Sequence, residues 1–74
     1  MINHALILRK RKRNYAMLKA RQYAKIRNIY QANLWLRKAS EIHPVSELQL
    51  WGLQSIIGPY ESDSFNLEEV KLER

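Results

Sequence analysis

Five consecutive cations, Arg9 to Arg13, are the residues of this sequence with the clearest chemistry. Adjacent like charges repel one another and stabilise no fold by themselves, so the run indicates contact with phosphate or carboxylate groups. Each phosphate that a cation neutralises releases counterions, which makes such binding strongly dependent on salt. Arginine also suits phosphate because its planar group donates two parallel hydrogen bonds. The expected phosphate-binding residues are this run and the cations that follow it: Arg9, Lys10, Arg11, Lys12, Arg13, Lys19, Arg21, Lys25 and Arg27.

The charges are unevenly distributed along the chain. Residues 1–38 carry 11 Lys or Arg and no Asp or Glu, whereas residues 39–74 carry two Lys or Arg and seven Asp or Glu. The halves therefore carry +11 and −5, which gives the net charge of +6. A stretch of residues with charges of one sign cannot form ion pairs within its helix, and it creates an electrostatic field that attracts polyanions. This interpretation fails if the cations are neutralised within the fold by acidic residues of the second half: Glu61, Asp63, Glu68, Glu69 and Glu73.

Tyrosines are interleaved with the cations. Tyr15, Tyr23 and Tyr30 are separated by eight and seven residues and would share one face of a continuous helix. This periodicity favours a hydrophobic seam, and stacking on unpaired bases is the alternative. Trp35 falls on the other side of the same helix. There it could contact a partner or a membrane interface, or pack against the C-terminal segment.

Catalytic and metal-binding functions have little support in the sequence. The chain has no cysteine, and its two histidines, His4 and His43, are far apart, so several convergent metal ligands are not expected. Two glycines are too few for a glycine-rich phosphate loop, and turns and caps explain the serines. We therefore expect a non-enzymatic protein without a metal or another cofactor.

The elements that position the cations follow from where the chain is interrupted. Helix-breaking residues occur at His43–Pro44 and at Gly58–Pro59, and these positions divide the chain into three segments. The first segment is rich in good helix formers and contains neither proline nor glycine. It predicts one helix over about 14–39, capped by Asn14, or a longer helix that starts early and is capped by Asn3.

The second segment has clear helix signals and predicts a helix over about 47–57. Ser46 and Gln49 have the spacing of a capping box, and Gly58–Pro59 ends the helix. Its apolar residues point almost all the way round, so that one neighbouring helix cannot cover them all. We expect a second copy or a partner protein to contact some of these residues: Leu48, Leu50, Trp51, Leu53, Ile56 and Ile57.

The third segment, residues 60–74, is acidic. Asn66 and Glu69 again have capping-box spacing, which predicts a short helix at about 67–73. Seven residues do not hold a helix in water without packing, so this segment is expected to pack alongside the others or to fray.

These patterns predict a single all-α domain over residues 1–74. A long basic N-terminal helix folds back on the short apolar helix as a helical hairpin, with a short C-terminal helix beside them. The apolar runs are far shorter than the roughly 20 residues that cross a bilayer, so integral membrane insertion is not expected. The expected location is intracellular, in the cytoplasm, with the nucleoid or nucleus as alternatives.

The leading functional hypothesis is a nucleic-acid-binding accessory factor for RNA or a ribonucleoprotein, with the N-terminal helix on the phosphates. The alternative is a small protein–protein regulator or inhibitor, which docks through helix 47–57 on an acidic or nucleic-acid-binding surface of a larger protein. Peripheral membrane binding is a third reading. The choice between RNA, DNA and an acidic protein surface stays open, as does the presence of a homodimer.

Overall fold

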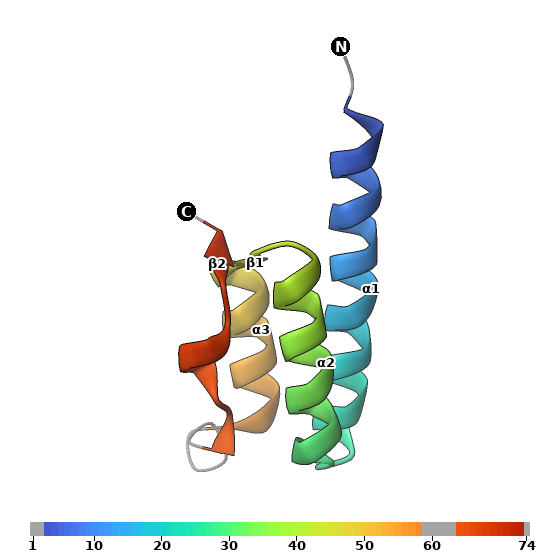
Figure 1. Ribbon diagram of the computed structural model, residues 1–74. Coiled ribbons are helices and arrows are strands. Elements are labelled where there is room, and N and C mark those ends of the chain that lie inside the picture. The colour runs from blue at the N-terminus through green and yellow to red at the C-terminus, as the bar shows by residue number, and fades with distance from the viewer. Residues whose placement is uncertain (1–2, 59–63, 74) are drawn as a thin grey trace.

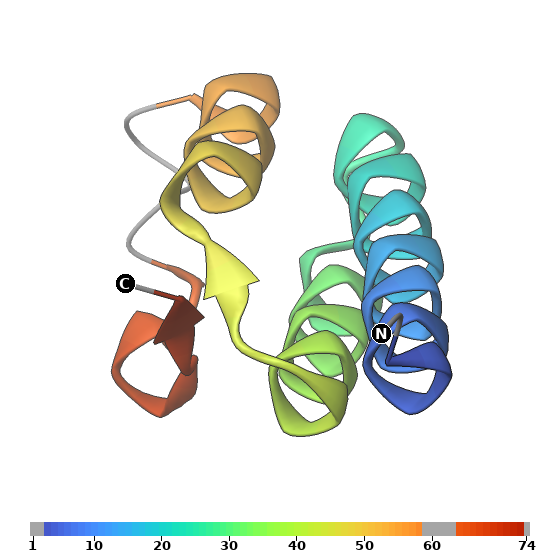
Figure 2. The ribbon, with the colours of Figure 1, turned by 90° about the horizontal axis from the view of Figure 1, so that it is seen from above.

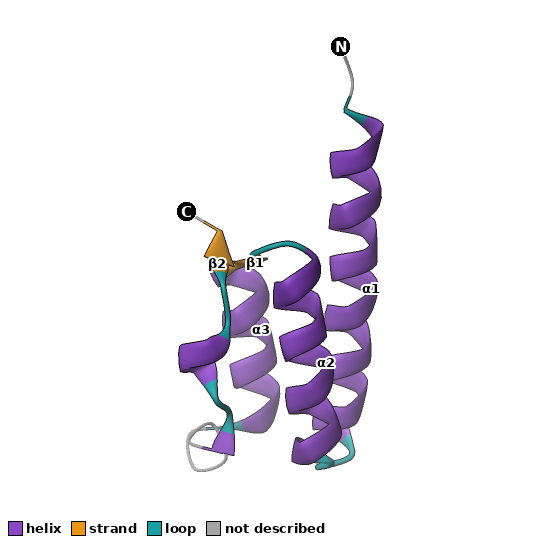
Figure 3. Ribbon diagram, in the orientation of Figure 1, coloured by secondary structure: helices purple, strands orange, loops and turns teal. Residues whose placement is uncertain are grey.

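In the described part of the chain, three helices lie side by side, with a short parallel sheet at one end of them (Figure 1). The computed structural model describes residues 3–58 and 64–73. The fold is mainly helical, which confirms the predicted all-α class. In chain order the elements are α1 (His4–Lys25), α2 (Ile29–Ile42), β1 (Val45–Ser46), α3 (Glu47–Ile57), the 3-10 turn η2 (Leu67–Glu69) and β2 (Leu72–Glu73). Figure 3 separates these elements by type.

The prediction of one helix over 14–39 is wrong, because the chain reverses between α1 and α2. The Arg27 N–H donates to the Ala24 carbonyl at 3.0 Å, and the Asn28 N–H donates to the Tyr23 carbonyl at 2.9 Å. This pair of bonds is the Schellman motif that ends many helices. Arg27 takes a φ of 63°, a left-handed conformation that glycine usually supplies at this position. The helical hairpin is therefore formed by α1 and α2 (Figure 2).

Asparagine starts both helices of this hairpin. The Asn28 side chain accepts a hydrogen bond from the Gln31 N–H at 3.2 Å, which makes Asn28 the N-cap of α2. Asn3 caps α1 in the same way and accepts from the Leu6 N–H at 3.2 Å. The early start that the sequence allowed is therefore the one observed, and Asn14 lies inside α1.

The first turns of α1 extend beyond the rest of the molecule (Figure 1). At 1.5 Å per residue, the 22 residues of α1 span about 33 Å and the 14 residues of α2 about 21 Å. The first buried residue of α1 is Arg13. We call residues 4–12, which precede it, the N-terminal arm.

Helix α3 agrees with its predicted bounds, 47–57. Both bonds of the capping box are present: the Gln49 N–H donates to Ser46 Oγ at 3.1 Å, and the Ser46 N–H donates to Gln49 Oε1 at 3.3 Å. The helix ends at Gly58, whose φ is 88° and ψ is 170°. Only glycine adopts this backbone region readily, so the helix can end at Gly58 without backbone strain.

A helix over 67–73 is not formed. The chain makes the single turn η2 and then the strand β2, which pairs in parallel with β1 in the register Val45 to Leu72 and Ser46 to Glu73. Asn66 makes no side-chain capping bond. The segment is too short to sustain a helix alone, and its backbone groups pair with β1 instead; the Val45 N–H donates to the Lys71 carbonyl at 2.8 Å.

The core between α1 and α2 is lined by alanine. Small side chains let the two helix backbones approach closely, and larger residues fill the space toward α3 and the C-terminal segment. The predicted tyrosine seam is wrong for two of its members: Tyr15 is 56% exposed and Tyr30 is 71% exposed, because the chain reversal places them on different helices. The buried apolar residues are Ala16, Met17, Ala20, Ala24, Ala32, Leu36, Ala39, Val45, Leu53, Ile57 and Phe65.

Candidate nucleic-acid interface

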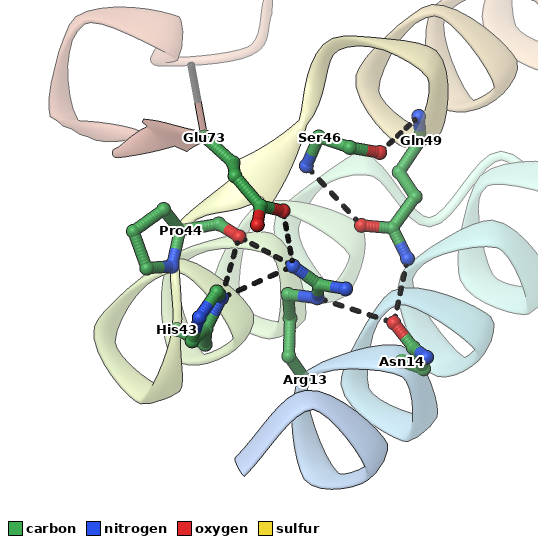
Figure 4. A network of polar contacts seen from close by, with 7 residues as sticks. All are labelled: Arg13, Asn14, His43, Pro44, Ser46, Gln49 and Glu73. Carbon is green, nitrogen blue, oxygen red and sulfur yellow. Dashed lines mark hydrogen bonds and ion pairs between the residues drawn. The ribbon is translucent and has the colours of Figure 1, made fainter. Parts of the chain in front are cut away.

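Arg13, the last residue of the basic run, is used by the fold. It is only 7% exposed, and its Nη1 donates to the Pro44 carbonyl at 2.6 Å and to Glu73 Oε2 at 3.1 Å. The same nitrogen lies 3.1 Å from Nδ1 of His43. Arg13 therefore joins α1 to the α2–β1 connection and to β2 (Figure 4), and it is withdrawn from the predicted phosphate-binding set.

The polar network around Arg13 continues into α3. Arg13 Nε donates to Asn14 Oδ1 at 3.1 Å, and the same oxygen accepts from Gln49 Nε2 at 2.8 Å. Gln49 is also the capping-box residue of α3 (Figure 4). The sequence did not predict this contact, because Asn14 and Gln49 lie 35 positions apart.

Arg27 also makes hydrogen bonds within the fold. Its Nη1 donates to the Ile57 carbonyl at 3.1 Å and to the Ile56 carbonyl at 3.3 Å, in the last turn of α3. A cation is favourable there because the final carbonyls of a helix lack intrahelical donors and carry partial negative charge. Arg27 therefore holds the α1–α2 turn against the end of α3.

The other seven predicted cations lie on the surface of α1. Arg9, Arg11, Lys12, Arg21 and Lys25 are exposed, and two more, Lys10 and Lys19, are partly exposed.

Acidic side chains of the described residues do not pair with these seven cations. Among the described residues, the ion pairs are Arg13–Glu73 at 3.1 Å and Arg37–Glu69 at 2.8 Å. Within residues 3–58 and 64–73, none of the seven surface cations has a carboxylate partner. Glu61 and Asp63, two of the acidic residues that could have neutralised them, lie outside the described residues.

A groove with a volume of about 390 Å³ lies between α1 and α2. Its aromatic part is formed by Tyr15 of α1 and Trp35 of α2, whose ring centroids are 6.2 Å apart and whose planes meet at 82°. This edge-to-face arrangement is a favourable one for two aromatic rings. We call it the α1–α2 groove, and its lining residues are Arg11, Lys12, Tyr15, Ala16, Trp35, Lys38 and Ile42.

Cations surround the two rings of the α1–α2 groove. Lys38 Nζ lies 4.7 Å from the centre of the Trp35 ring, and Lys19 Nζ lies 5.7 Å from the centre of the Tyr15 ring, both within the range of a cation–π contact. Arg11 and Lys12 line the same groove, and no acidic residue is among its lining residues. The groove thus combines an apolar, aromatic surface with three lining cations, Arg11, Lys12 and Lys38, and Lys19 lies beside it.

The sequence did not identify this groove, since it depends on the reversal at Arg27–Asn28. In a continuous helix Tyr15 and Trp35 would be about 30 Å apart. Lys38 was not among the predicted site residues for the same reason. Asn28, which is a good N-cap type in the middle of a long run of helix formers, is the one local signal that could have revealed the reversal.

The predicted interface on α3 is smaller than expected. Leu53 is 1% exposed and Ile57 is buried, and Leu50 and Ile56 pack against the same core. The protein's own elements therefore cover most of the apolar surface of α3. The predicted interface residues that remain exposed are Leu48, at 76%, and Trp51, at 66%.

Metal sites and membrane-spanning helices are not found among the described residues. Those residues contain no group of three or more His, Asp or Glu side chains that could hold a metal ion. Their helices lack the combination of length and apolarity that crossing a bilayer requires. Comparisons of the chain with protein-family models, curated proteins and solved structures give no significant match. The surface of α1 is therefore interpreted from its own charge and geometry.

Proposed function

We propose that the protein is a non-enzymatic nucleic-acid-binding factor that contacts the phosphates of RNA, or of a ribonucleoprotein, through α1. The observation that carries the proposal is the set of seven surface cations on one helix, none of which has a carboxylate partner among the described residues. A surface of this kind attracts polyanions from a distance and gains affinity from counterion release on contact.

The cations of α1 lie on two sides of the helix. Lys12 and Lys19 are seven residues apart, which is two turns, so both lie on the side of the α1–α2 groove. Lys10 and Arg21 are 11 residues apart, which is three turns, and face away from the groove. A single strand that follows the groove would contact Arg11, Lys12, Lys19 and Lys38. Four such contacts predict a slope of log affinity against log salt of about −3 for single strands, or roughly a 50-fold loss between about 50 and 200 mM salt.

Fluorescence anisotropy with labelled RNA tests the proposal. The double variant Arg11→Gln, Lys12→Gln lowers the net charge by two and removes two surface cations that make no ion pair with the described residues. We expect its affinity for RNA to fall at least tenfold at 50 mM salt while its circular dichroism spectrum stays that of the parent protein. Lys71→Glu lowers the net charge by the same amount on an exposed residue outside α1 and is the matched control. Equal affinities of the double variant and the parent would contradict the proposal.

A second candidate function, docking on a larger protein through α3, is favoured by the exposed pair Leu48 and Trp51. These residues are three apart and therefore neighbours on the helix surface. Replacing both with serine should abolish capture of a protein partner from a nuclease-treated lysate without altering RNA binding. Leu53, another of the predicted interface residues on α3, is unsuitable for this test because it is part of the core.

A further inference from the structure

The α1–α2 groove has the features of a site for an unpaired nucleotide. We propose that it binds one nucleotide of a single-stranded nucleic acid, with the base against Tyr15 and Trp35 and the phosphates among Arg11, Lys12 and Lys38. This inference rests on the proposed function and specifies which form of nucleic acid the surface recognises.

The chemistry of the groove selects a ligand that is both planar and anionic. Tyr15 is 56% exposed, and the Tyr15 and Trp35 rings form the aromatic lining of the groove. An exposed aromatic surface of this kind stacks on the flat face of any nucleobase. The lining also contains three cations and no carboxylate, so a neutral or cationic ring would be a poorer match than one that carries phosphate.

The position of Lys38 links phosphate binding to stacking of the base. Its ammonium lies 4.7 Å from the centre of the Trp35 ring, so a phosphate paired with Lys38 stays within reach of the indole. Lys19, at 5.7 Å from the centre of the Tyr15 ring, stands in the same relation to the other aromatic residue. A phosphate on one of these lysines therefore holds the attached base close to an aromatic surface, as happens in many single-strand sites.

The base must be unpaired to reach this surface. Bases within a duplex are stacked on one another and present only their edges in the grooves, whereas bases in single strands can be splayed out onto protein side chains. The volume of about 390 Å³ falls within the roughly 300–1,000 Å³ of pockets that hold small organic ligands, a range that suits one nucleotide. The rest of the strand would continue along Lys12 and Lys19 on α1.

The 74-residue chain should bind a single strand more tightly than a duplex. Anisotropy titrations at 50 mM salt would use a labelled oligouridylate and a blunt RNA duplex of equal length. We expect Tyr15→Leu, which keeps an apolar side chain and removes the ring, to weaken binding of the single strand at least about fivefold. The slope of affinity against salt should not change, because no cation is removed, and duplex binding should also be unaltered. Tyr30→Leu, which replaces a still more exposed tyrosine outside the groove, should bind like the parent.

Tryptophan fluorescence supplies a readout that does not depend on a substitution in the groove. In a Trp51→Phe background the emission comes from Trp35, and the oligouridylate should quench it at the concentrations that saturate the anisotropy signal. Uridine monophosphate should quench it only at far higher concentration, since it lacks the neighbouring phosphates.

The outcomes separate this inference from the proposed function. If single strand and duplex bind equally, and Tyr15→Leu and the parent are indistinguishable, the groove assignment is overturned while nucleic-acid binding by α1 stands. Quenching by uridine monophosphate at the same concentration as by the strand would also overturn the assignment to a strand. If neither nucleic acid binds at 50 mM salt, both proposals are wrong.

Discussion

The guanidinium of Arg13 and the carboxylate of Glu73, 60 positions apart in the chain, form an ion pair of 3.1 Å that closes the C-terminal segment onto α1. The pair is asymmetric: the Arg13 side chain is 8% exposed and that of Glu73 is 38% exposed. Because water reaches the carboxylate, the ion pair itself contributes modestly to stability. The larger effect of Arg13 comes from its hydrogen bond to the Pro44 carbonyl and from the packing of its buried stem.

Removal of Arg13 should destabilise the protein more than removal of any neighbouring cation. We expect Arg13→Ala to lower the free energy of unfolding by about 2–3 kcal/mol, since it leaves a partly buried carbonyl and a carboxylate without their donor. Arg11→Ala, on the exposed side of the same helix, should change it by less than about 0.5 kcal/mol. Urea denaturation measures both values. Equal effects of the two substitutions would show that the Arg13 network contributes nothing to stability.

The two asparagine caps provide a second comparison. Asn28→Ala removes the N-cap of α2 within the folded hairpin and should cost about 1 kcal/mol, which lowers the melting temperature by about 4–8 °C for a domain of this size. Asn3→Ala removes the same type of bond, but the N-terminal arm that it caps lacks buried residues. The melting temperature of Asn3→Ala should therefore stay close to that of the parent, with only a small loss of helical signal. A larger effect at Asn3 than at Asn28 would contradict the boundaries of α2.

Helix α3 separates core residues from exposed ones on the same element. Leu53→Ala should cost about 2–5 kcal/mol because Leu53 is fully buried and its truncation leaves a cavity. Leu48→Ala, five residues earlier on the same helix, should change stability by less than about 0.5 kcal/mol. Denaturant titrations of the two variants test the distinction, and comparable losses would mean that α3 packs through a different face.

The two sides of α1 should differ in their effect on single-strand binding. Arg11→Gln with Lys12→Gln removes two groove cations and should reduce the salt slope by about 1.4, at about 0.7 per lost phosphate contact. Arg21→Gln with Lys25→Gln removes the same charge from outside the groove and should leave the slope nearly unchanged. Anisotropy titrations at several salt concentrations provide the slopes. Identical slopes for the two double variants would indicate diffuse attraction without a preferred path for the strand.

Elements whose determinants are local could be predicted from the sequence. Helix α3 is the clearest example, because Ser46, Gln49 and Gly58 all lie within a few residues of its ends. The α1–α2 turn was missed because its left-handed residue is Arg27 in place of the usual glycine. The hydrogen bonds from Arg27 to the end of α3 help to hold that conformation, and they join residues about 30 positions apart.

Similar reasons explain what the sequence could and could not indicate about the site. Residue type alone identified the surface cations, since a cation without a partner faces water. It did not separate Arg13 from Arg11, because the partners of Arg13 are 31 and 60 positions away. The α1–α2 groove required Trp35 to lie beside Tyr15, and nothing local in the sequence indicates that pairing. The strand β2 was missed for the same reason, as its partner is β1.

The N-terminal arm carries four of the eight cations of α1, and its first turns extend beyond the rest of the molecule (Figure 1). Isolated helices of this length are marginal in water, and the first turn carries no acidic residue to favour the helix dipole. Amide protons of the arm should therefore exchange with solvent much faster than those between Ala16 and Ala24. A bound polyanion would relieve the repulsion among the cations, and by thermodynamic linkage the gain in helical order and the gain in affinity are the same free energy. Under the proposed function, the ligand itself would complete the helical order of the N-terminal arm, and protection of the arm amides would report its occupancy.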